Sequence, residues 1–233
     1  MNLIKILIIV TNISQYESGN LETGLWLSEL THLYAAAEAK GYDITIASPN
    51  GGNVPLDPES LKKMMLDKVS KAYLNDSAFM NLLKNSKSLK AIENEKFDVV
   101  YLAGGHGTMY DFPNDTTMQN IIAKQYESGK IVAAICHGVG GLLNVKLTNG
   151  NYLIQNKKMT GFSWFEEKLA RRKKEVPFNL EAELKTKNPN YKKAFIPMTS
   201  KVVVDGNLIT GQNPFSSKKM AKVVMQQLQN QIK

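Results

Sequence analysis

Four short apolar runs stand out along the chain, at residues 4–10, 42–47, 99–103 and 131–135. Each run has the length of a strand, and a continuous apolar run is typical of a parallel strand buried on both faces. Segments with helical spacing lie between these runs, at residues 23–40 and 114–128 and in fragments between 58 and 90. Two of them end at a glycine, Gly41 and Gly129, which is a common helix C-terminal signal. The alternation predicts a parallel sheet with helices on both faces, that is, a three-layer α/β/α sandwich.

The C-terminal part adds an antiparallel excursion to this pattern. An Asp-Gly pair at 205–206 separates two apolar runs, which is a strong hairpin signal. A last helix is expected from Ser216 or Ser217 to about Gln229. The chain has no internal repeat, low-complexity linker or break in composition, so we expect one domain over residues 1–233.

Composition and charge exclude several classes of protein. A single cysteine cannot form an intramolecular disulfide, so the chain suits a reducing compartment. The apolar N-terminal run is too short for a secretion signal or a membrane span, so we expect a cytoplasmic protein with no membrane partner. The net charge of +8 is spread along the chain, and glutamates dilute the one basic cluster at 168–174. Because no nucleic-acid-binding motif accompanies it, nucleic acid is not an expected partner.

The sole cysteine, Cys136, directly follows the predicted strand at 131–135 and precedes His137 and a glycine-rich segment. A nucleophile on such a strand-to-helix turn projects from the carboxyl end of a parallel sheet, where open α/β folds bind their ligands. The alternative is a buried structural cysteine, because free cysteine packs as a small hydrophobic residue. The position on the turn favours a reactive site.

A reactive Cys136 needs help to ionise. A thiol with a pKa of ~8.5 is only a few per cent thiolate at pH 7. To be mainly thiolate, its pKa must fall by ~2–3 units, which requires ~3–4 kcal/mol of stabilisation of the thiolate. A helix N-terminus supplies only ~0.3–2 kcal/mol, so a further hydrogen-bond donor is required. Glu29 is the candidate, since it flanks the apolar stripe of Trp26 and Leu33, where a buried carboxyl would stay protonated. The alternative is a glutamate at the edge of the stripe that reaches water.

A second glycine cluster, Gly104, Gly105 and Gly107, follows the predicted strand at 99–103. The amide groups of such a loop can bind a substrate oxyanion or a phosphate. The loop matches neither the Walker nor the Rossmann pattern, so nucleotide binding lacks its main support. His106 in this loop is a candidate for substrate binding, or else a hydrogen-bonded loop residue. Three scattered histidines and one cysteine favour no metal site.

Together these motifs resemble the ThiJ/PfpI superfamily over nearly the whole chain. Residues 134–138 resemble its nucleophile elbow, residues 103–107 its oxyanion loop, and residues 23–29 the helix with its conserved acid, which falls on Glu29. Residues 160–167 resemble a segment of the branch that contains glutathione-independent glyoxalases and heat-shock chaperone-like proteins. There the acid that orients His137 falls on Glu167, with Glu166 as the neighbouring alternative. Val139 departs from the pattern, because many relatives have proline at this position.

The resemblance implies a flavodoxin-like domain of the class I glutamine amidotransferase-like type, and a homodimer. Glutaminase chemistry is not expected, because it uses a histidine far downstream of the cysteine and no histidine follows His137.

The favoured function is that of a cofactor-free lyase of the glyoxalase III type, acting on methylglyoxal or a related small aldehyde in carbonyl-stress defence. Cys136 would attack the aldehyde, backbone amides of Gly105 and His137 would hold the oxyanion, and Glu29 with His137 would move the proton between the two carbons. Hydrolase or deglycase-type activity is a variant of this chemistry. The alternatives are a stress-response holdase or cysteine-oxidation sensor on the same scaffold and, ranked last, a protease or amidase, because residues 156–197 could cover the site.

Overall fold

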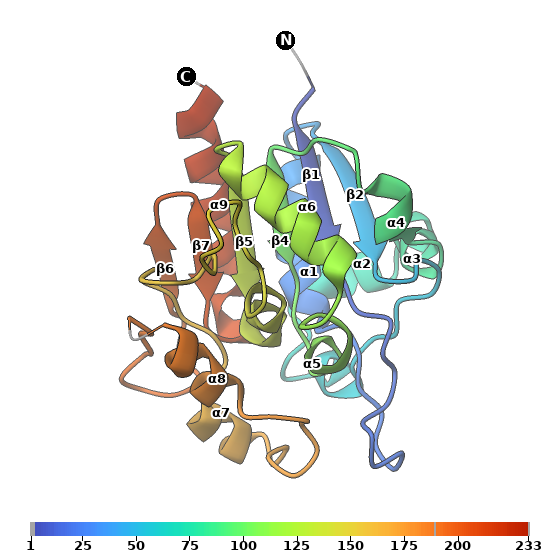
Figure 1. Ribbon diagram of the computed structural model, residues 1–233. Coiled ribbons are helices and arrows are strands. Elements are labelled where there is room, and N and C mark those ends of the chain that lie inside the picture. Colours follow the sequence, from blue (N-terminus) through green and yellow to red (C-terminus); the bar gives the residue numbers. More distant parts are fainter. Residues whose placement is uncertain (1–2, 189, 233) are drawn as a thin grey trace.

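One seven-stranded sheet runs through the computed structural model, which describes residues 3–188 and 190–232 (Figure 1). The strand order is β3-β2-β1-β4-β5-β7-β6. The strands are β1 (Lys5–Ile9), β2 (Asp43–Ser48), β3 (Lys87–Ser88), β4 (Val99–Leu102), β5 (Ile131–Ile135), β6 (Val202–Asp205) and β7 (Leu208–Gly211). Neighbouring strands are parallel except β6 and β7, which form the predicted antiparallel pair.

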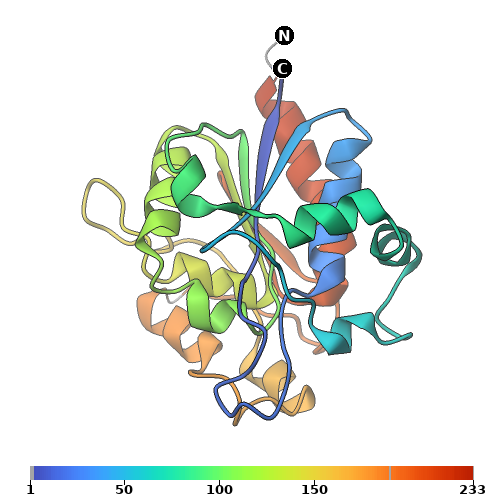
Figure 2. The same ribbon diagram turned by 90° about the vertical axis from the view of Figure 1, so that its right-hand side faces the viewer.

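Helices cover both faces of the sheet, as the alternating pattern predicts. The α-helices are α1 (Leu27–Glu38), α2 (Lys68–Leu74), α3 (Ser77–Lys84), α4 (Leu89–Ile92), α5 (Thr108–Asp111), α6 (Thr116–Glu127), α7 (Trp164–Leu169), α8 (Leu180–Lys187) and α9 (Ser217–Ile232), and 3₁₀ helices span Pro58–Leu61, Cys136–Leu142 and Pro214–Ser216. Helices α1 and α9 pack side by side on one face, and α6 packs on β4 and β5 from the other, as the side view shows (Figure 2). The predicted α/β/α sandwich with a flavodoxin-like, mostly parallel sheet is confirmed.

The central strands are covered from both sides, which explains their apolar sequences. Every residue of β4, β5 and β7 is buried. Parallel strands covered on both faces have no solvent side, so both sets of alternating side chains are apolar. Among the described residues, no helix has the length and apolar character needed to cross a bilayer.

The first long helix begins later than the sequence pattern predicts. Residues 23–26 are not helical, because their amide groups bond to other segments: Leu25 donates to Pro55 O at 2.8 Å and Trp26 to Gly104 O at 3.1 Å. These bonds tie the start of α1 to the loop that follows β4. The last helix begins at Ser217, one of the two predicted positions, and continues to Ile232.

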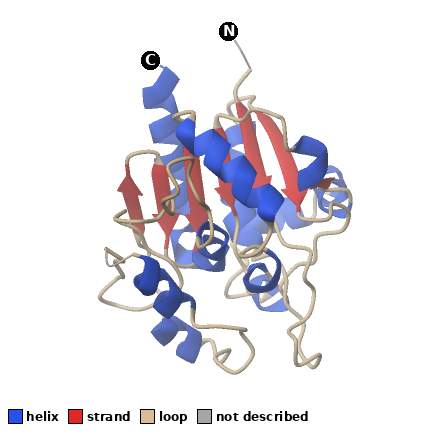
Figure 3. Ribbon diagram, in the orientation of Figure 1, coloured by secondary structure: helices blue, strands red, loops and turns tan. Residues whose placement is uncertain are grey.

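The loops at the carboxyl ends of the parallel strands form the edge on which the site is built. The chain passes from β1 to β2 on one side and later enters β4 on the other side of β1, which creates a topological switch point where α/β folds bind ligands. Helices α5, α7 and α8 lie below this edge, as the view by secondary structure shows (Figure 3).

The difference between central and edge strands leads to a matched pair of stability predictions. Val132 in β5 is fully buried, whereas Val204 in β6 is 42% exposed. Val132→Ala should lower the free energy of unfolding by roughly 1.5–3 kcal/mol, since it removes buried apolar volume. Val204→Ala should cost only about 0.5 kcal/mol. Urea denaturation of both variants measures the difference, and equal losses would contradict the assignment of β5 to the core.

Candidate active site

Cys136 occupies the turn at the end of β5. Its φ angle is 56°, in the left-handed region that residues with a side chain rarely adopt, and its side chain is only 1% exposed. The following 3₁₀ helix is buried throughout. Gly138 is required there, because a Cβ at this position would lie 2.7 Å from Leu102 O. The close packing of the elbow against β4 therefore fixes the direction of the Cys136 side chain.

His137 links the thiol to a buried carboxylate. Its Nδ1 lies 3.3 Å from Cys136 Sγ, and its Nε2 lies 2.7 Å from Glu167 Oε2. Burial raises the pKa of Glu167, but its contacts with His137 and His106 outweigh burial and hold that pKa well below the usual value. The ionised carboxylate can only accept, so Nε2 carries the proton and Nδ1 is left as the acceptor that faces the thiol.

The two neighbouring glutamates of α7, Glu166 and Glu167, have different hydrogen-bond partners. Ser163 caps the helix in a capping box with Glu166, whose Oε2 accepts bonds from the Ser163 amide and hydroxyl at 3.0 and 2.8 Å. Glu166 Oε1 accepts from Met198 N, Gln212 Nε2 and Asn213 Nδ2 at 2.8–2.9 Å. Glu166 thus holds distant segments together, and the geometry places Glu167, not Glu166, on His137.

Burial decides the protonation of the histidine. The pKa of His137 is lowered to about 4, because burial disfavours the charged imidazolium and His106 adds to this. The ring is therefore neutral around pH 7. A neutral ring with its proton on Nε2 can act as a base toward Cys136.

Glu29 enters the site from α1 and is fully buried. Its Oε2 accepts the Gly104 amide at 2.8 Å, and its Oε1 has no hydrogen-bond partner among the described residues. Burial raises the pKa of Glu29 to about 8, although the hydrogen bond from the Gly104 amide and the proximity of the Cys136 side chain partly oppose this. The carboxyl group is protonated at neutral pH. Since Oε2 already accepts a bond, the proton lies on Oε1, which is free to donate.

The cysteine is not the low-pKa thiolate that the sequence argument required. Burial raises the pKa of the Cys136 thiol well above its usual value, and Glu29 adds to the rise. The resting group is thus a neutral thiol. A neutral thiol in this position can transfer its proton to His137 Nδ1, as a hydroxyl nucleophile transfers its proton in a serine–histidine–acid triad.

The first two amides of the glycine loop after β4 differ in whether they are free to donate a hydrogen bond. The Gly104 amide is occupied by Glu29 and is not available to a substrate oxygen. The Gly105 amide donates to no acceptor among the described residues. Gly105 also permits a close approach, since a Cβ here would lie 2.1 Å from Gly24 O. Of the two predicted oxyanion glycines, Gly105 retains a free donor.

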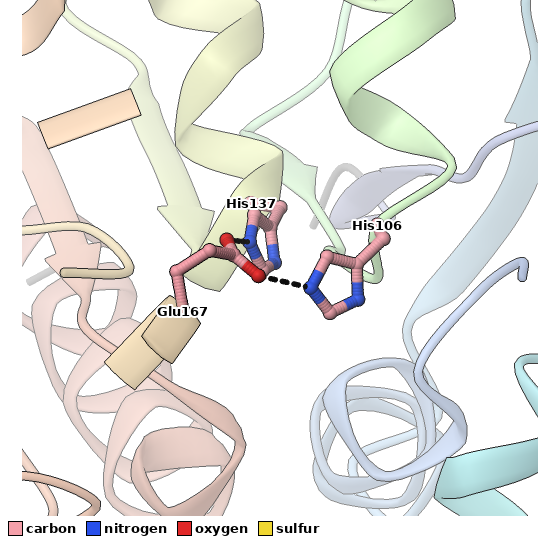
Figure 4. Close-up of side chains that lie close together, drawn as sticks. All are labelled: His106, His137 and Glu167. Carbon is pink, nitrogen blue, oxygen red and sulfur yellow. Dashed lines mark hydrogen bonds and ion pairs between the residues drawn. The ribbon is translucent and has the colours of Figure 1, made fainter. Parts of the chain in front are cut away.

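His106 shares the carboxylate with His137. Its Nε2 lies 2.8 Å from Glu167 Oε1, and the two imidazole rings have centroids 4.1 Å apart and are tilted by 38° to each other. Figure 4 shows the two oxygens of Glu167 joined by dashed lines to the two rings, one oxygen to each. On its other side, His106 Nδ1 is 4.0 Å from Asp57 Oδ2. Asp57 was not a candidate from the sequence, because an acid before Pro58 has the pattern of an ordinary helix cap, which it also forms.

A small apolar cavity of about 60 Å³ opens beside these groups. Cys136, His106 and His137 contribute to its wall. The rest of the wall is formed by Trp26, Met65, Phe162, Ala170, Met198, Pro214 and Phe215. Larger hollows of about 430 and 460 Å³ lie elsewhere on the surface, but their walls contain neither the cysteine nor a histidine. The reactive groups and the small cavity therefore define the candidate site.

Fold and site together define a flavodoxin-like α/β protein with a cysteine-centred site on a nucleophile elbow. The chain belongs to the DJ-1/PfpI family, whose sequence profile matches residues 21–227.

Similar proteins cover nearly its whole length. Glyoxalase 3 of Candida albicans is 29% identical over 231 residues, which cover 96% of this chain and 98% of the relative. A glutathione-independent glyoxalase of Saccharomyces cerevisiae is 28% identical, covering 97% of this chain and 98% of the relative.

Two solved structures are similar over the same extent. The crystal structure of Candida albicans glyoxalase III has a TM-score of 0.86 at 30% identity and covers 96% of this chain and 97% of its own. Rapid Encystment Protein 24 KDa of Francisella tularensis has a TM-score of 0.92 at 39% identity, covering 97% of this chain and 99% of its own.

The protonated state of Glu29 can be tested through stability. A carboxyl whose pKa is raised in the folded state binds its proton more tightly there than in the unfolded chain, so stability falls as pH rises from the unfolded to the folded pKa. With a folded pKa of about 8, the free energy of unfolding of wild type should fall by roughly 3 kcal/mol relative to that of Glu29→Gln between pH 5 and pH 7.5. Denaturant unfolding of both proteins at the two pH values measures this loss. A constant difference would mean that Glu29 is already ionised at pH 5.

Proposed function

We propose that this protein is an enzyme, a glutathione-independent glyoxalase that converts methylglyoxal or related 2-oxoaldehydes to 2-hydroxy acids. The observation that carries the proposal is the buried series Cys136–His137–Glu167, whose first two residues border a cavity of about 60 Å³, together with the protonated Glu29 near Cys136. The names of the full-length relatives support the same chemistry. Dependence on the cysteine and assignment to the lyases are part of this proposal.

The first step is attack by Cys136 on the aldehyde carbon, C1. The thiol proton passes to His137 Nδ1 over the 3.3 Å contact, and Sγ forms a bond to C1 as the carbonyl electron pair moves to oxygen. Glu167 stabilises the imidazolium that forms, through its 2.7 Å bond to Nε2. The amides of Gly105 and His137 stabilise the oxyanion, which takes up a proton to give a hemithioacetal.

The second step moves hydrogen from C1 to C2 through an enediol. A base removes the C1 proton, the electrons pass to the C2 carbonyl, and reprotonation at C2 gives a 2-hydroxy thioester. C1 is oxidised and C2 is reduced by the same two electrons, so the step consumes no external oxidant or reductant. Glu29 Oε1–H supplies a proton to the developing oxygen anion, and water then releases the hydroxy acid and the free thiol.

The cavity favours a small substrate. Its volume of about 60 Å³ is a few times the 10–15 Å³ that one water needs. The wall opposite the reactive groups is apolar and accommodates a hydrogen or methyl substituent on C2. The site thus suits glyoxal and methylglyoxal better than a branched or aromatic 2-oxoaldehyde.

A holdase is the second candidate, and one observation favours it. Phe195 is 101% exposed, its neighbour Ile196 62% and Met64 92%, and exposed apolar side chains can bind unfolded chains. This activity would not need the thiol. The homodimer implied by the family resemblance stays a prediction.

The first test of the proposal is the loss of turnover in Cys136→Ser. Wild type should form lactate from methylglyoxal without glutathione, and the variant should lose at least about 100-fold in kcat, because the hydroxyl is a far weaker nucleophile. Chiral analysis of lactate measures the product. Equal rates in both proteins would overturn the glyoxalase assignment, and retained suppression of client aggregation by both would then favour the holdase.

The second test separates the role of Glu167 from a general effect of losing a carboxylate. Glu167→Gln should lower kcat by roughly 10²–10⁴ with little change in KM, since the amide cannot stabilise the imidazolium formed during attack. Glu183→Gln on the exposed face of α8 is the matched control and should be unchanged. Steady-state kinetics with methylglyoxal measures both. A change in KM with kcat unchanged would contradict the role of Glu167 in the attack step.

A further inference from the structure

The fold brings together two of the three histidines and an acid that are far apart in the sequence. One ring nitrogen of His106, one of His137 and a carboxylate oxygen of Glu167 all lie within 4.8 Å of one another. All three side chains are at least 94% buried, with exposures of 6%, 1% and 3%. Two imidazoles and one carboxylate are a donor set that suits Zn²⁺, and three protein ligands with one open position are typical of its non-structural sites.

The positions of the donor atoms fit a tetrahedral ion after a small adjustment. Zinc ligands at ~2.0–2.2 Å from the ion are roughly 3.4 Å apart in a tetrahedron. His137 Nε2 lies 2.7 Å from Glu167 Oε2 and His106 Nε2 lies 2.8 Å from the other oxygen, Oε1, so each contact has to open by roughly 0.6 Å for an ion to enter between the rings and the carboxylate. Both histidines also border the cavity of about 60 Å³, which leaves room for a water as the fourth ligand.

The opposite nitrogen of each ring faces a group that can accept a proton. A histidine that binds metal usually donates its other N–H to a carboxylate or another acceptor, which fixes the ring and its tautomer. His106 Nδ1 faces Asp57 Oδ2 at 4.0 Å, and His137 Nδ1 faces Cys136 Sγ at 3.3 Å. Asp57 is itself 1% exposed and held by Thr23 Oγ1 and the Glu59 amide. His137 Nδ1 thus has a contact partner at 3.3 Å, whereas His106 Nδ1 would have to approach Asp57 more closely to donate to it.

From this geometry we propose that His106, His137 and Glu167 form a binding site for a divalent transition metal of the Zn²⁺ type, and that the bound ion inhibits the enzyme. Binding at Nε2 of His137 moves the ring proton of that histidine to Nδ1, and no electron is transferred. Cys136 is not a ligand, because its sulfur lies at the Nδ1 edge of His137 and the ion binds at the Nε2 edge.

Inhibition follows from the change of tautomer and rests on the proposed function, whereas binding does not. With its proton on Nδ1, His137 can no longer accept the thiol proton, and the ion occupies the carboxylate that stabilises the imidazolium. The site then holds a reversible metal-inhibited form of the enzyme. Chelation of the ion restores the Nε2–H tautomer.

The test is calorimetric titration of the metal-free full-length chain with ZnCl₂ at pH 7.5, which measures binding without reference to activity. Wild type should bind one Zn²⁺ per chain, and both His106→Gln and Glu167→Gln should weaken binding by at least about tenfold. His32→Gln removes the third histidine, which pairs with Asp67 away from the cluster, and should bind as wild type does. Thermal melting of each metal-free variant verifies its fold, and two separate ligand variants guard against one that fails to fold.

Cys136→Ser separates this proposal from the glyoxalase assignment. The variant should bind Zn²⁺ with unchanged affinity although it turns over no aldehyde. Loss of binding in Cys136→Ser, or unchanged binding in both His106→Gln and Glu167→Gln, would overturn the site. With wild type, one equivalent of Zn²⁺ should abolish lactate formation and EDTA should restore it; full activity of the saturated protein would overturn the inhibitory role.

Discussion

One ionised carboxylate, Glu167, organises the site, because it accepts hydrogen bonds from two buried imidazoles at once. These bonds fix the tautomer of His137 and thereby decide that its free nitrogen faces the thiol. They are available only if α7 reaches across the carboxyl edge of the sheet. The capping box at Ser163 and the bonds of Glu166 to two distant segments, at Met198 and at Gln212 with Asn213, hold the helix there. Of these adjacent glutamates, Glu166 connects α7 to other segments and Glu167 contacts the two histidines.

Burial of the site raises the pKa values of Glu29 and Cys136 and lowers that of His137. It keeps Glu29 protonated and His137 neutral, so the site contains one donor and one base around pH 7. It also disfavours the thiolate of Cys136, so the nucleophile forms only when the proton moves to His137. A neutral resting thiol costs less to bury than a thiolate would in the same apolar surroundings. The arrangement also constrains the local sequence. Cys136 must adopt a left-handed backbone conformation, and residue 138 must be glycine because it packs closely against β4.

Local sequence patterns predicted the sheet, the helices on both faces, the hairpin and the elbow, since each depends on short-range periodicity or turn chemistry. Cys136, His137 and the loop of Gly104 and Gly105 could be placed because they directly follow buried strands. Other features are non-local and had no pattern in the sequence. The pairing of Asp57 with His106, the use of the Gly104 amide by Glu29 and the choice of Glu167 over Glu166 depend on how loops distant in the chain meet at one edge. The start of α1 was predicted too early for the same reason, because residues 23–26 bond to other loops.

The central claim is that a neutral thiol is activated by a neutral His137 beside a protonated Glu29. The pH dependence of kcat/KM for methylglyoxal tests it most directly, because it reports the pKa values of the essential groups in the free enzyme. The profile should be bell-shaped, with an acid limb near pH 4 from His137 and an alkaline limb near pH 8 from Glu29. A rate that continues to rise above pH 8, as expected if formation of the Cys136 thiolate limits attack, would contradict the account.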